Sequence, residues 1–416
     1  MSGKSELRIF DKHLPQVTVE SGTFIDINPT TSLSENASTI DFVIRGSEGE
    51  YLDLNDTFLY VLLNVVTNDN KKLASTSTIV PSNFFMNALF QDVILKLNDT
   101  VIEGGNRLYS YKATIEDVFN FDRDAKDLQL YMKGYDESAD DRKSWIAGSR
   151  DCSCVGALRL DFFNQPTNLL PGVDVTVTLQ RSKDTFALAN TTKGSKIVIK
   201  EAKLFVRRIK ANPSVSVAHE LGLKKQNAIY SYNRGQVVTY AIPAESQSHF
   251  KDNLFSRSLL PKFVVVGFVT SGAMNGDETV TTDPFKFDHF NVCSVGLFRD
   301  GQSVPFRKLY EPNFESGSVA LDYFRAMIHC PQHFNTNYNN GVRHEQYKEG
   351  EMTFFTFNLT PDYDFTQSQL ARDANLRLEV KFQKPLLSPI NAVVYGVFDT
   401  QLHITKDRAI ILDNVH

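Results

Sequence analysis

The sequence predicts an all-β fold, and three observations support this prediction. Apolar and polar residues alternate with a period of two in many segments, as they do in half-buried strands of antiparallel sheets. Clusters of turn-forming residues separate these segments. The 416 residues include 31 Phe and 15 Tyr but a single Trp, and rings of this kind suit sheets. The length fits two β domains, because β-sandwiches often reach about 200–250 residues.

The predicted strands follow one another along the whole chain. The clearest are 173–179 and 376–382, where Val, Leu or Phe alternates with polar residues. Weaker alternation predicts strands at 40–44, 93–97, 158–162, 196–209 and 355–359. The expected turns are Asn68-Asp69-Asn70, Asn98-Asp99, Pro171-Gly172, Asp300-Gly301 and Asn339-Asn340-Gly341.

Only two segments show the 3.6-residue spacing of a helix. The first carries Leu108, Tyr111, Ile115 and Phe119. The second carries Val319, Tyr323, Ala326 and Met327, with Ser316 or Ser318 as the candidate N-cap. The fold class therefore stays all-β, with one short helix in each half.

The landmarks occur twice in the same order: a strand with an Asp-containing turn, a helix and an alternating strand. They are separated by 202 residues (93 to 295), 208 (115 to 323) and 203 (173 to 376). A nearly constant offset indicates a duplicated β domain. We place the joint near Asn212-Pro213-Ser214 and predict an N-terminal arm (1–37), a first domain (38–211) and a second domain (212–416). Many strands with one helix favour a jelly roll over an up-and-down barrel.

The overall charge argues against a protein that coats nucleic acid. There are 44 basic and 49 acidic residues, a net charge of −5, whereas a phosphate-binding surface is expected to be basic. The best nucleic-acid candidate is a basic run that alternates with apolar residues, which we interpret as the solvated face of a strand. This run consists of Lys196, Lys200, Lys203, Arg207, Arg208 and Lys210.

The remaining composition points to a protein made and assembled in a reducing interior. The first residues lack the apolar stretch of a secretory signal, and no apolar run is long enough for a membrane span. Four cysteines are too few for a disulfide framework in a chain of this length; they are Cys152, Cys154, Cys293 and Cys330.

Several motifs are candidates for metal or catalytic sites. The best metal candidate is the group His329, Cys330, His333 and His344, but it lacks a second cysteine pair, and the spacing of Cys152 and Cys154 is not that of a zinc finger. An exposed loop explains these histidines more simply. We therefore expect no metal and no cofactor.

The motifs of common enzymes are incomplete. Gly3-Lys4-Ser5 matches the end of a P-loop but has no upstream glycine, and no Gly-x-Ser-x-Gly elbow occurs. The pairs Asp122/Asp124 and Asp140/Asp141 could imitate a glycosidase dyad, but solvated loops account for them. We therefore predict no catalytic residues and no enzyme.

A series of short blocks runs in a fixed order from about residue 40 to 410. In the first half these are Tyr51-Leu52-Asp53-Leu54, Ala88-Leu89-Phe90-Gln91-Asp92-Val93, Leu97-Asn98, Tyr109-Ser110-Tyr111-Lys112-Ala113-Thr114-Ile115-Glu116 and Leu170-Pro171-Gly172-Val173-Asp174. In the second half they are Leu260-Pro261-Lys262, Val264-Val265-Val266-Gly267, Pro284-Phe285-Lys286-Phe287-Asp288-His289, Asp300-Gly301-Gln302, Leu359-Thr360-Pro361-Asp362 and Lys406-Asp407-Arg408.

In these blocks the sequence resembles the major capsid proteins of Polinton (Maverick) transposon-viruses, or adintoviruses. These are hexon-like double jelly rolls related to adenovirus hexon and to virophage major capsid proteins. Two departures stand out, Ala88 for an expected Ser and Asp283 for an expected Asn. They leave the branch of the family open and do not affect the expected fold.

The resemblance implies two eight-stranded antiparallel β-sandwiches side by side, each with a short inserted helix. It implies a structural major capsid protein that self-assembles, as pseudo-hexameric homotrimeric capsomers, into an icosahedral shell around double-stranded DNA. The DNA would be held without sequence-specific binding. Expected partners are further copies of the chain, neighbouring capsomers, a single jelly-roll penton protein and other minor capsid proteins. The expected location is the virion, with the N-terminal arm beneath the shell.

An alternative interpretation is a jelly-roll carbohydrate-binding or polysaccharide-active protein. The predicted lack of a secretory signal disfavours it, and so does the single Trp145, since sugar clefts often use exposed Trp side chains.

Overall fold

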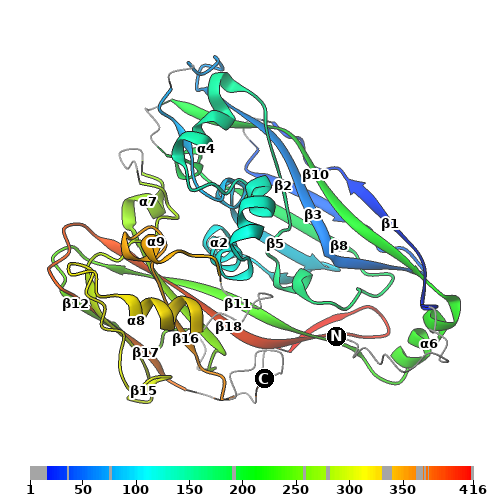
Figure 1. The fold of residues 1–416 in the computed structure, drawn as a ribbon. Helices are drawn as coiled ribbons and strands as arrows, with labels where there is room; N and C mark the ends of the chain where they lie inside the picture. The colour runs from blue at the N-terminus through cyan, green and yellow to red at the C-terminus, as the bar shows by residue number, and fades with distance from the viewer. Residues whose placement is uncertain are drawn as a thin grey trace, which may run out of the picture.

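The computed structural model consists of two β-sandwiches that lie side by side, one above the other in the view of Figure 1. It describes residues 16–34, 37–74, 77–189, 194–255, 259–277, 282–329, 340–361, 369, 372 and 374–413.

In the described residues of the first half there are ten strands. They are β1 (Val19–Ile27), β2 (Thr39–Ile44), β3 (Glu50–Thr67), β4 (Val80–Pro81), β5 (Phe90–Leu97), β6 (Thr100–Glu103), β7 (Cys152–Gly156), β8 (Val175–Arg181), β9 (Leu188–Ala189) and β10 (Ser195–Ala211). Its helices are α1 (Phe85–Ala88), α2 (Tyr109–Asn120), α3 (Arg123–Ala125), α4 (Ala139–Ile146) and α5 (Asp184–Ala187). The short 3₁₀ or π turns are η1 (Lys126–Leu130), η2 (Tyr131–Lys133), η3 (Ala147–Ser149) and η4 (Asp161–Asn164).

The second half follows helix α6 (Pro213–Leu223). Its strands are β11 (Ala228–Ile242), β12 (Ser248–Lys251), β13 (Phe263–Thr270), β14 (Val292–Arg299), β15 (Gln302–Val304), β16 (Phe354–Asn358), β17 (Leu376–Phe382), β18 (Ile390–Ile404) and β19 (Ile410–Asp413). Its helical segments are α7 (Ser271–Asn275), α8 (Ala320–Tyr323), η5 (Phe324–His329) and α9 (His344–Lys348).

The two halves have the same strand order. The first half has sheets β1-β10-β3-β7 and β2-β8-β5-β6, and the second has β11-β18-β13-β16 and β12-β17-β14-β15. Strand β19 adds to β18, and β4 pairs with β9. Each half is an eight-stranded antiparallel jelly roll. The predicted all-β double jelly roll is confirmed.

The strand register repeats as well. Val93 lies opposite Leu179 in the first half, and Val295 lies opposite Val380 in the second. The tight turns after these strands also match. Asn98 and Asp99 have φ of 43° and 66°, and Asp300 and Gly301 have φ of 49° and 83°. Asn, Asp and Gly tolerate this left-handed region, so these residues support a tight reversal at the same place in each half.

The clearest alternating segments form half-buried strands, as predicted. In β8 the side chains of Val175, Val177 and Leu179 are fully buried while their neighbours are partly exposed, and β17 alternates in the same way. In contrast, β13 and β16 are buried on both faces because the first half covers the outer face of their sheet. The outer layer explains why residues 263–269 are almost continuously apolar.

One predicted strand is wrong. Residues 158–162 are not a strand; the chain turns into η4 at Asp161, where Phe162 and Phe163 are buried in succession. The Asp161 carboxylate accepts a hydrogen bond from the backbone N–H of Gly235 and pairs with Lys112, and these contacts hold the segment between the two halves. Tertiary contacts override the local alternation here.

The helix predictions are partly confirmed. Helix α2 forms as predicted, but α8 begins after Val319 without a side-chain cap and continues as η5. The longest helices that were not predicted are α4 and α6. Helix α4 is capped by Ser138, and α6 by Asn212, whose side chain accepts from the N–H of Ser214 at 3.0 Å. Helix α6 buries only its last residue and exposes Val217 and Leu221, so no apolar stripe of this helix faces the core.

The predicted domain limits at 37 and 211 stay a prediction. Helix α6 lies between β10 and β11, at the expected joint. Strand β1 lies within the segment predicted as the N-terminal arm, and it pairs with β10 from Val19 to Ile27. This part of the arm is an edge strand of the first barrel.

Candidate assembly site at the joint between the barrels

The residues considered as metal ligands are not brought together by the described part of the chain. The side chain of His329 and all of Cys330 and His333 lie outside the described residues, whereas His344 begins α9 and its ring stands edge-on to Tyr323 at 5.2 Å. Among the residues that the structure describes, no group of three His, Cys, Asp or Glu side chains could hold a metal ion. The metal-free state stays a prediction.

The other candidate motifs have local structural roles. Asp122 caps α3 by accepting from the N–H of Ala125 at 2.9 Å, and Asp140 and Asp141 lie in the first turn of α4. Acidic residues favour that position because of the helix dipole. Cys152 and Cys154 lie on β7 as free thiols, as Cys293 does on β14, and Gly3-Lys4-Ser5 lies outside the described residues. None of the helices in the described ranges is long and apolar enough to cross a membrane.

The basic run lies along β10, and most of its charges face carboxylates. Lys200 pairs with Asp151, Lys203 with Glu201 and Arg208 with Glu50. Arg207 reaches both Asp53 and Asp56, and Lys210 pairs with Glu20. This neutralisation supports the interpretation as the solvated face of a strand rather than a phosphate-binding stripe.

The joint between the barrels is built largely from the sequence blocks described above. Phe285 of the second half lies among three rings of the first half, those of Phe84, Tyr111 and Phe186, at centroid distances of 5.6–6.4 Å. The Tyr111 hydroxyl donates to the carbonyl of Pro284 at 3.2 Å. Edge-on aromatic pairs of this kind contribute stabilisation beyond that of the apolar area they bury, so this contact holds the two barrels together.

Two polar contacts extend the joint to its ends. At one end the Asp283 carboxylate accepts from the N–H of Asn83 at 2.7 Å and lies 3.4 Å from the Arg142 guanidinium. At the other end Arg408 Nε donates to the carbonyl of Pro171 at 2.8 Å, and the Asn98 side chain donates to the carbonyl of Arg408 at 2.9 Å. Asp283, a departure from the expected pattern, thus keeps a charged partner in the first half.

Buried charges occupy the centre of the joint. Lys112, on α2, forms ion pairs with Glu103, with Asp161 at 2.9 Å and with Glu116 at 3.5 Å. The second half completes the cluster: the Tyr395 hydroxyl donates to Glu116 at 3.1 Å, and the Gly235 N–H donates to Asp161 at 2.9 Å. A buried ammonium needs carboxylates around it, and here hydrogen bonds from both barrels hold them in place.

Asp117, next on α2, has its own pair of cations. Lys133 Nζ and Arg159 Nε each lie 2.6 Å from its carboxylate, and the side-chain amide of Asn87 donates to it at 2.8 Å. Burial raises the pKa of Asp117, but the two cations outweigh burial and leave the pKa below its ordinary value. This carboxylate is therefore charged.

A polar cleft of about 330 Å³ lies beside the charge cluster. Its lining residues come from both barrels and include Asn120, Arg159, Tyr232, Asn233 and Tyr395.

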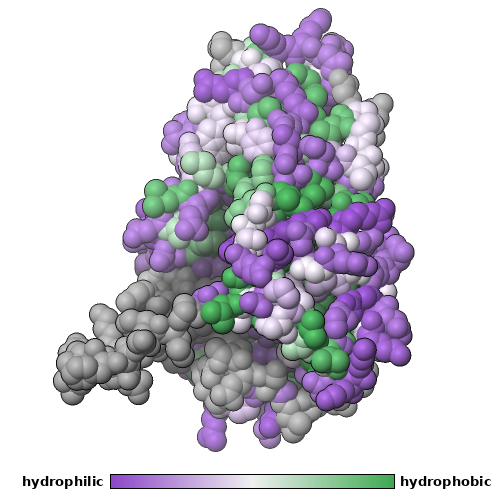
Figure 2. All heavy atoms as spheres, turned by 90° about the vertical axis from the view of Figure 1, so that its right-hand side faces the viewer, coloured by the Kyte–Doolittle hydropathy of each residue, from purple (hydrophilic) through white to green (hydrophobic). Residues whose placement is uncertain are grey.

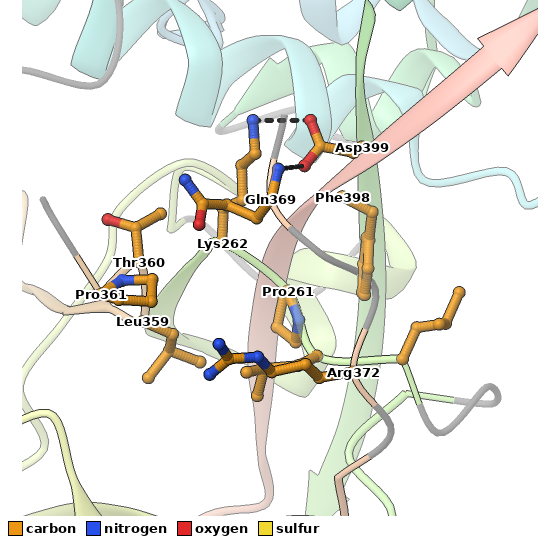
Figure 3. A pocket seen from close by; sticks show the side chains of 11 residues that line it. Pro261, Lys262, Leu359, Thr360, Pro361, Gln369, Arg372, Phe398 and Asp399 are labelled. Carbon is orange, nitrogen blue, oxygen red and sulfur yellow. Dashed lines mark hydrogen bonds and ion pairs between the residues drawn. The ribbon is translucent and has the colours of Figure 1, made fainter. Parts of the chain in front are cut away.

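A smaller hollow lies within the second barrel, where the blocks Leu260-Pro261-Lys262 and Leu359-Thr360-Pro361 meet (Figure 3). Lys262 pairs with Asp399 at 2.6 Å, and the N–H of Gln369 donates to the same carboxylate at 2.8 Å. The volume of this hollow is about 40 Å³, room for a few water molecules and too little for a sugar ring. The hollow therefore gives no support to the carbohydrate-binding alternative.

Three carboxylates share one ammonium in the central cluster, so at least one holds its proton unusually tightly. Burial, and then the neighbouring Asp161, raise the pKa of Glu103 from 4.5 to about 7 against the opposing effect of Lys112. Burial likewise raises the pKa of Asp161 to about 6. A raised carboxyl pKa in the folded state stabilises the fold below the unfolded pKa, and this contribution is lost as the pH rises through the folded pKa.

We predict that the stability of the wild type relative to Glu103→Gln falls as the pH rises from about 4.5 to 7. The glutamine stays neutral, so the difference isolates the titration of Glu103, with a change on the order of a few kcal/mol. Urea unfolding of both proteins at several pH values measures it. A difference that is constant or increases with pH would contradict the prediction.

These features define the protein as a double jelly roll whose barrels are locked through a buried joint. No protein-family model matches the chain. Over 395 residues the chain is 23% identical to a Caenorhabditis elegans protein, "Uncharacterized protein F54H12.2". The matched region covers 90% of this chain and 93% of that protein.

Solved structures of viral capsid proteins share the fold over nearly the whole chain. A Sputnik virophage chain superposes with a TM-score of 0.63 at 10% identity, covering 99% of this chain and 92% of its own. The mavirus major capsid protein superposes with a TM-score of 0.54 at 12% identity, covering 99% of this chain and 93% of its own. The Faustovirus major capsid protein gives 0.56 at 10% identity, with coverage of 96% and 93%. At these identities the similarity establishes the double jelly-roll fold.

Proposed function

We propose that the protein is a structural major capsid protein and not an enzyme. Three copies form a pseudo-hexameric capsomer, and the capsomers assemble into an icosahedral shell that encloses double-stranded DNA. The single observation that carries the proposal is a repeated jelly roll whose two copies are fixed side by side by a continuous joint. Such a unit presents two similar barrels in a fixed orientation, as six similar positions around a threefold axis require.

The joint supports a rigid building block. Aromatic rings, hydrogen bonds to the buried carboxylates and backbone contacts cross it at several places, including Phe285, Tyr395 and Arg408. Interfaces that are large and well packed restrict relative domain motion. The fold shared with the Sputnik, mavirus and Faustovirus proteins over almost the full chain supports the same role.

The finer features of the proposal follow from the sequence resemblance. The chain is of the Polinton/Maverick, or adintovirus, type and is located in the virion. Its partners are further copies of itself, a single jelly-roll penton protein and other minor capsid proteins. DNA is enclosed without sequence-specific contacts, in keeping with the net charge of −5 and the ion-paired basic residues on β10.

The test is the mass of the purified protein in solution, followed by electron microscopy. The chain mass is 47.0 kDa, so three copies give 141 kDa. We expect a 141 kDa species that forms shells or hexagonal sheets when concentrated. A protein that stays at 47.0 kDa at all concentrations and binds polysaccharide would overturn the proposal.

A further inference from the structure

The two barrels carry equivalent helices with very different surroundings. In the first half α2 is buried from Tyr109 to Phe119, because it lies between its own barrel and the second one (Figure 1). Phe119, for example, contacts Phe263 of β13 and Phe354 of β16. In the second half the corresponding segment, α8 with η5, lies outside this joint (Figure 1).

The α8–η5 segment exposes an apolar ridge, defined by Leu321, Phe324 and Ile328. These side chains are 57%, 48% and 37% exposed, and their spacing of three and four residues places them on one face. The opposite side is firmly anchored. Arg325 lies over the rings of Phe306 and Tyr310, each at 4.3 Å, and the Thr356 hydroxyl donates to the carbonyl of Ala326 at 2.9 Å. The side chains of the ridge thus keep a large exposed fraction, while the other side of the segment is anchored to its own barrel.

The surface that receives α2 within the chain is the outer face of the second-half sheet β11-β18-β13-β16. Contact with the first half buries this face at β13, β16 and much of β18. Its equivalent in the first half is the outer face of the sheet β1-β10-β3-β7.

That first-half face is only partly covered, and its centre is apolar. Phe58 stacks on Phe205 at 4.8 Å and lies 6.0 Å from Phe24, which is 50% exposed. Ion pairs such as Arg207 with Asp53 flank this aromatic row. The right-hand side of the molecule in Figure 1, where β1 and β10 lie, faces the viewer in Figure 2; there hydrophobic side chains appear among hydrophilic ones.

We propose that the apolar ridge of one copy docks on the aromatic row of the next copy. The contact between chains then repeats the packing of α2 on the second barrel, so one kind of helix-to-sheet contact links successive barrels. The inference rests on the proposed function and specifies its subunit interface. Because the ridge and the row are different surfaces, the contact is heterologous and generates a closed ring when the rotation closes. Three chains supply the six barrels of that ring.

The first test places a charge on each surface. Leu321→Glu and Phe24→Glu alter exposed side chains, so both proteins should keep the wild-type circular dichroism and melting temperature. Each should lose the 141 kDa species and remain at 47.0 kDa in light scattering. The matched control is Leu387→Glu, the same change at a fully exposed leucine outside both surfaces, which should stay trimeric.

Mixing the two variants distinguishes this contact from others. The Phe24→Glu protein keeps an intact ridge and the Leu321→Glu protein keeps an intact row, so one contact forms per pair. The mixture should yield a 94 kDa heterodimer, twice 47.0 kDa, and no trimer. If the wild type is trimeric and both variants are too, the interface is wrong while the capsid proposal stands. If the wild type is monomeric at every concentration, the capsid proposal fails first and the interface with it.

Discussion

Val177→Asp and Leu378→Asp should each give insoluble or unfolded protein. Val177 is fully buried on β8, and Leu378 is 2% exposed on β17, its partner in the repeat. A carboxylate at either position would be unpaired in a dry core, which is destabilising by on the order of 5 kcal/mol. That is a large part of the roughly 5–15 kcal/mol that stabilises a domain. Because the joint couples the barrels, either variant alone should fail, as measured by soluble yield and circular dichroism.

The controls place the same charge on the outer faces of the same strands. Lys381→Asp alters an exposed residue of β17. On β8 two threonines, Thr176 and Thr178, lie on the outer face, and Thr176→Asp is the better control because Thr176 lies opposite the basic Lys96. The Thr178 hydroxyl already donates to Asp41 at 2.6 Å, so Thr178→Asp would place two carboxylates side by side. Both controls should be soluble. A soluble, folded Leu378→Asp protein would show that the strand face is misassigned.

Lys112→Met should be the most destabilising change in the joint. It leaves Glu103, Glu116 and Asp161 in a buried site without their shared cation. Breaking a buried ion pair by removing one partner is destabilising by about 3–5 kcal/mol, because an uncompensated charge remains. Denaturant unfolding at pH 8 measures the loss, and it should shrink at pH 5, where the carboxyls with raised pKa take up protons.

Lys200→Met provides the matched control. Lys200 pairs with Asp151 on the surface, where the two side chains are 40% and 49% exposed. An ion pair in that setting contributes about 0–1 kcal/mol, so the control should unfold almost as the wild type does. Equal losses in the two variants would show that the central cluster does not stabilise the joint.

Alternation in the sequence identified the buried face of a strand wherever the other face is exposed to solvent. Strands β2, β8 and β17 alternate because one face meets the core and the other meets solvent. Strand β16 has both faces buried, so its alternation of Phe and Thr did not separate inside from outside. The segment 158–162 alternates by coincidence, because contacts with the other barrel determine its path. The short helices capped by Ser138 and Asn212 present no apolar stripe to the core.

The joint was much harder to predict than the barrels. Lys112, Glu116 and Asp117 would ordinarily be assigned to a solvated helix face, since charged side chains are seldom fully buried. One feature of the sequence could have indicated that these charges are buried. On α2 they lie among Tyr109, Tyr111, Ile115 and Phe119, which leave no polar face on the helix. Glu103 lies only nine residues before Lys112, but Asp161 and Tyr395 are distant in sequence, and only the folded chain brings them together.

The burial of α2 between the barrels has a consequence for synthesis on the ribosome. The first half emerges first, and its partner surface on β13, β16 and β18 belongs to the 205 residues from 212 to 416. At a translation rate of about 5–20 residues per second, those residues take on the order of 10–40 s to appear. During that interval Tyr111 and Phe119 face water or a chaperone instead of Phe285 and Phe354. The nascent first barrel is therefore the stage at which this chain is most exposed to aggregation.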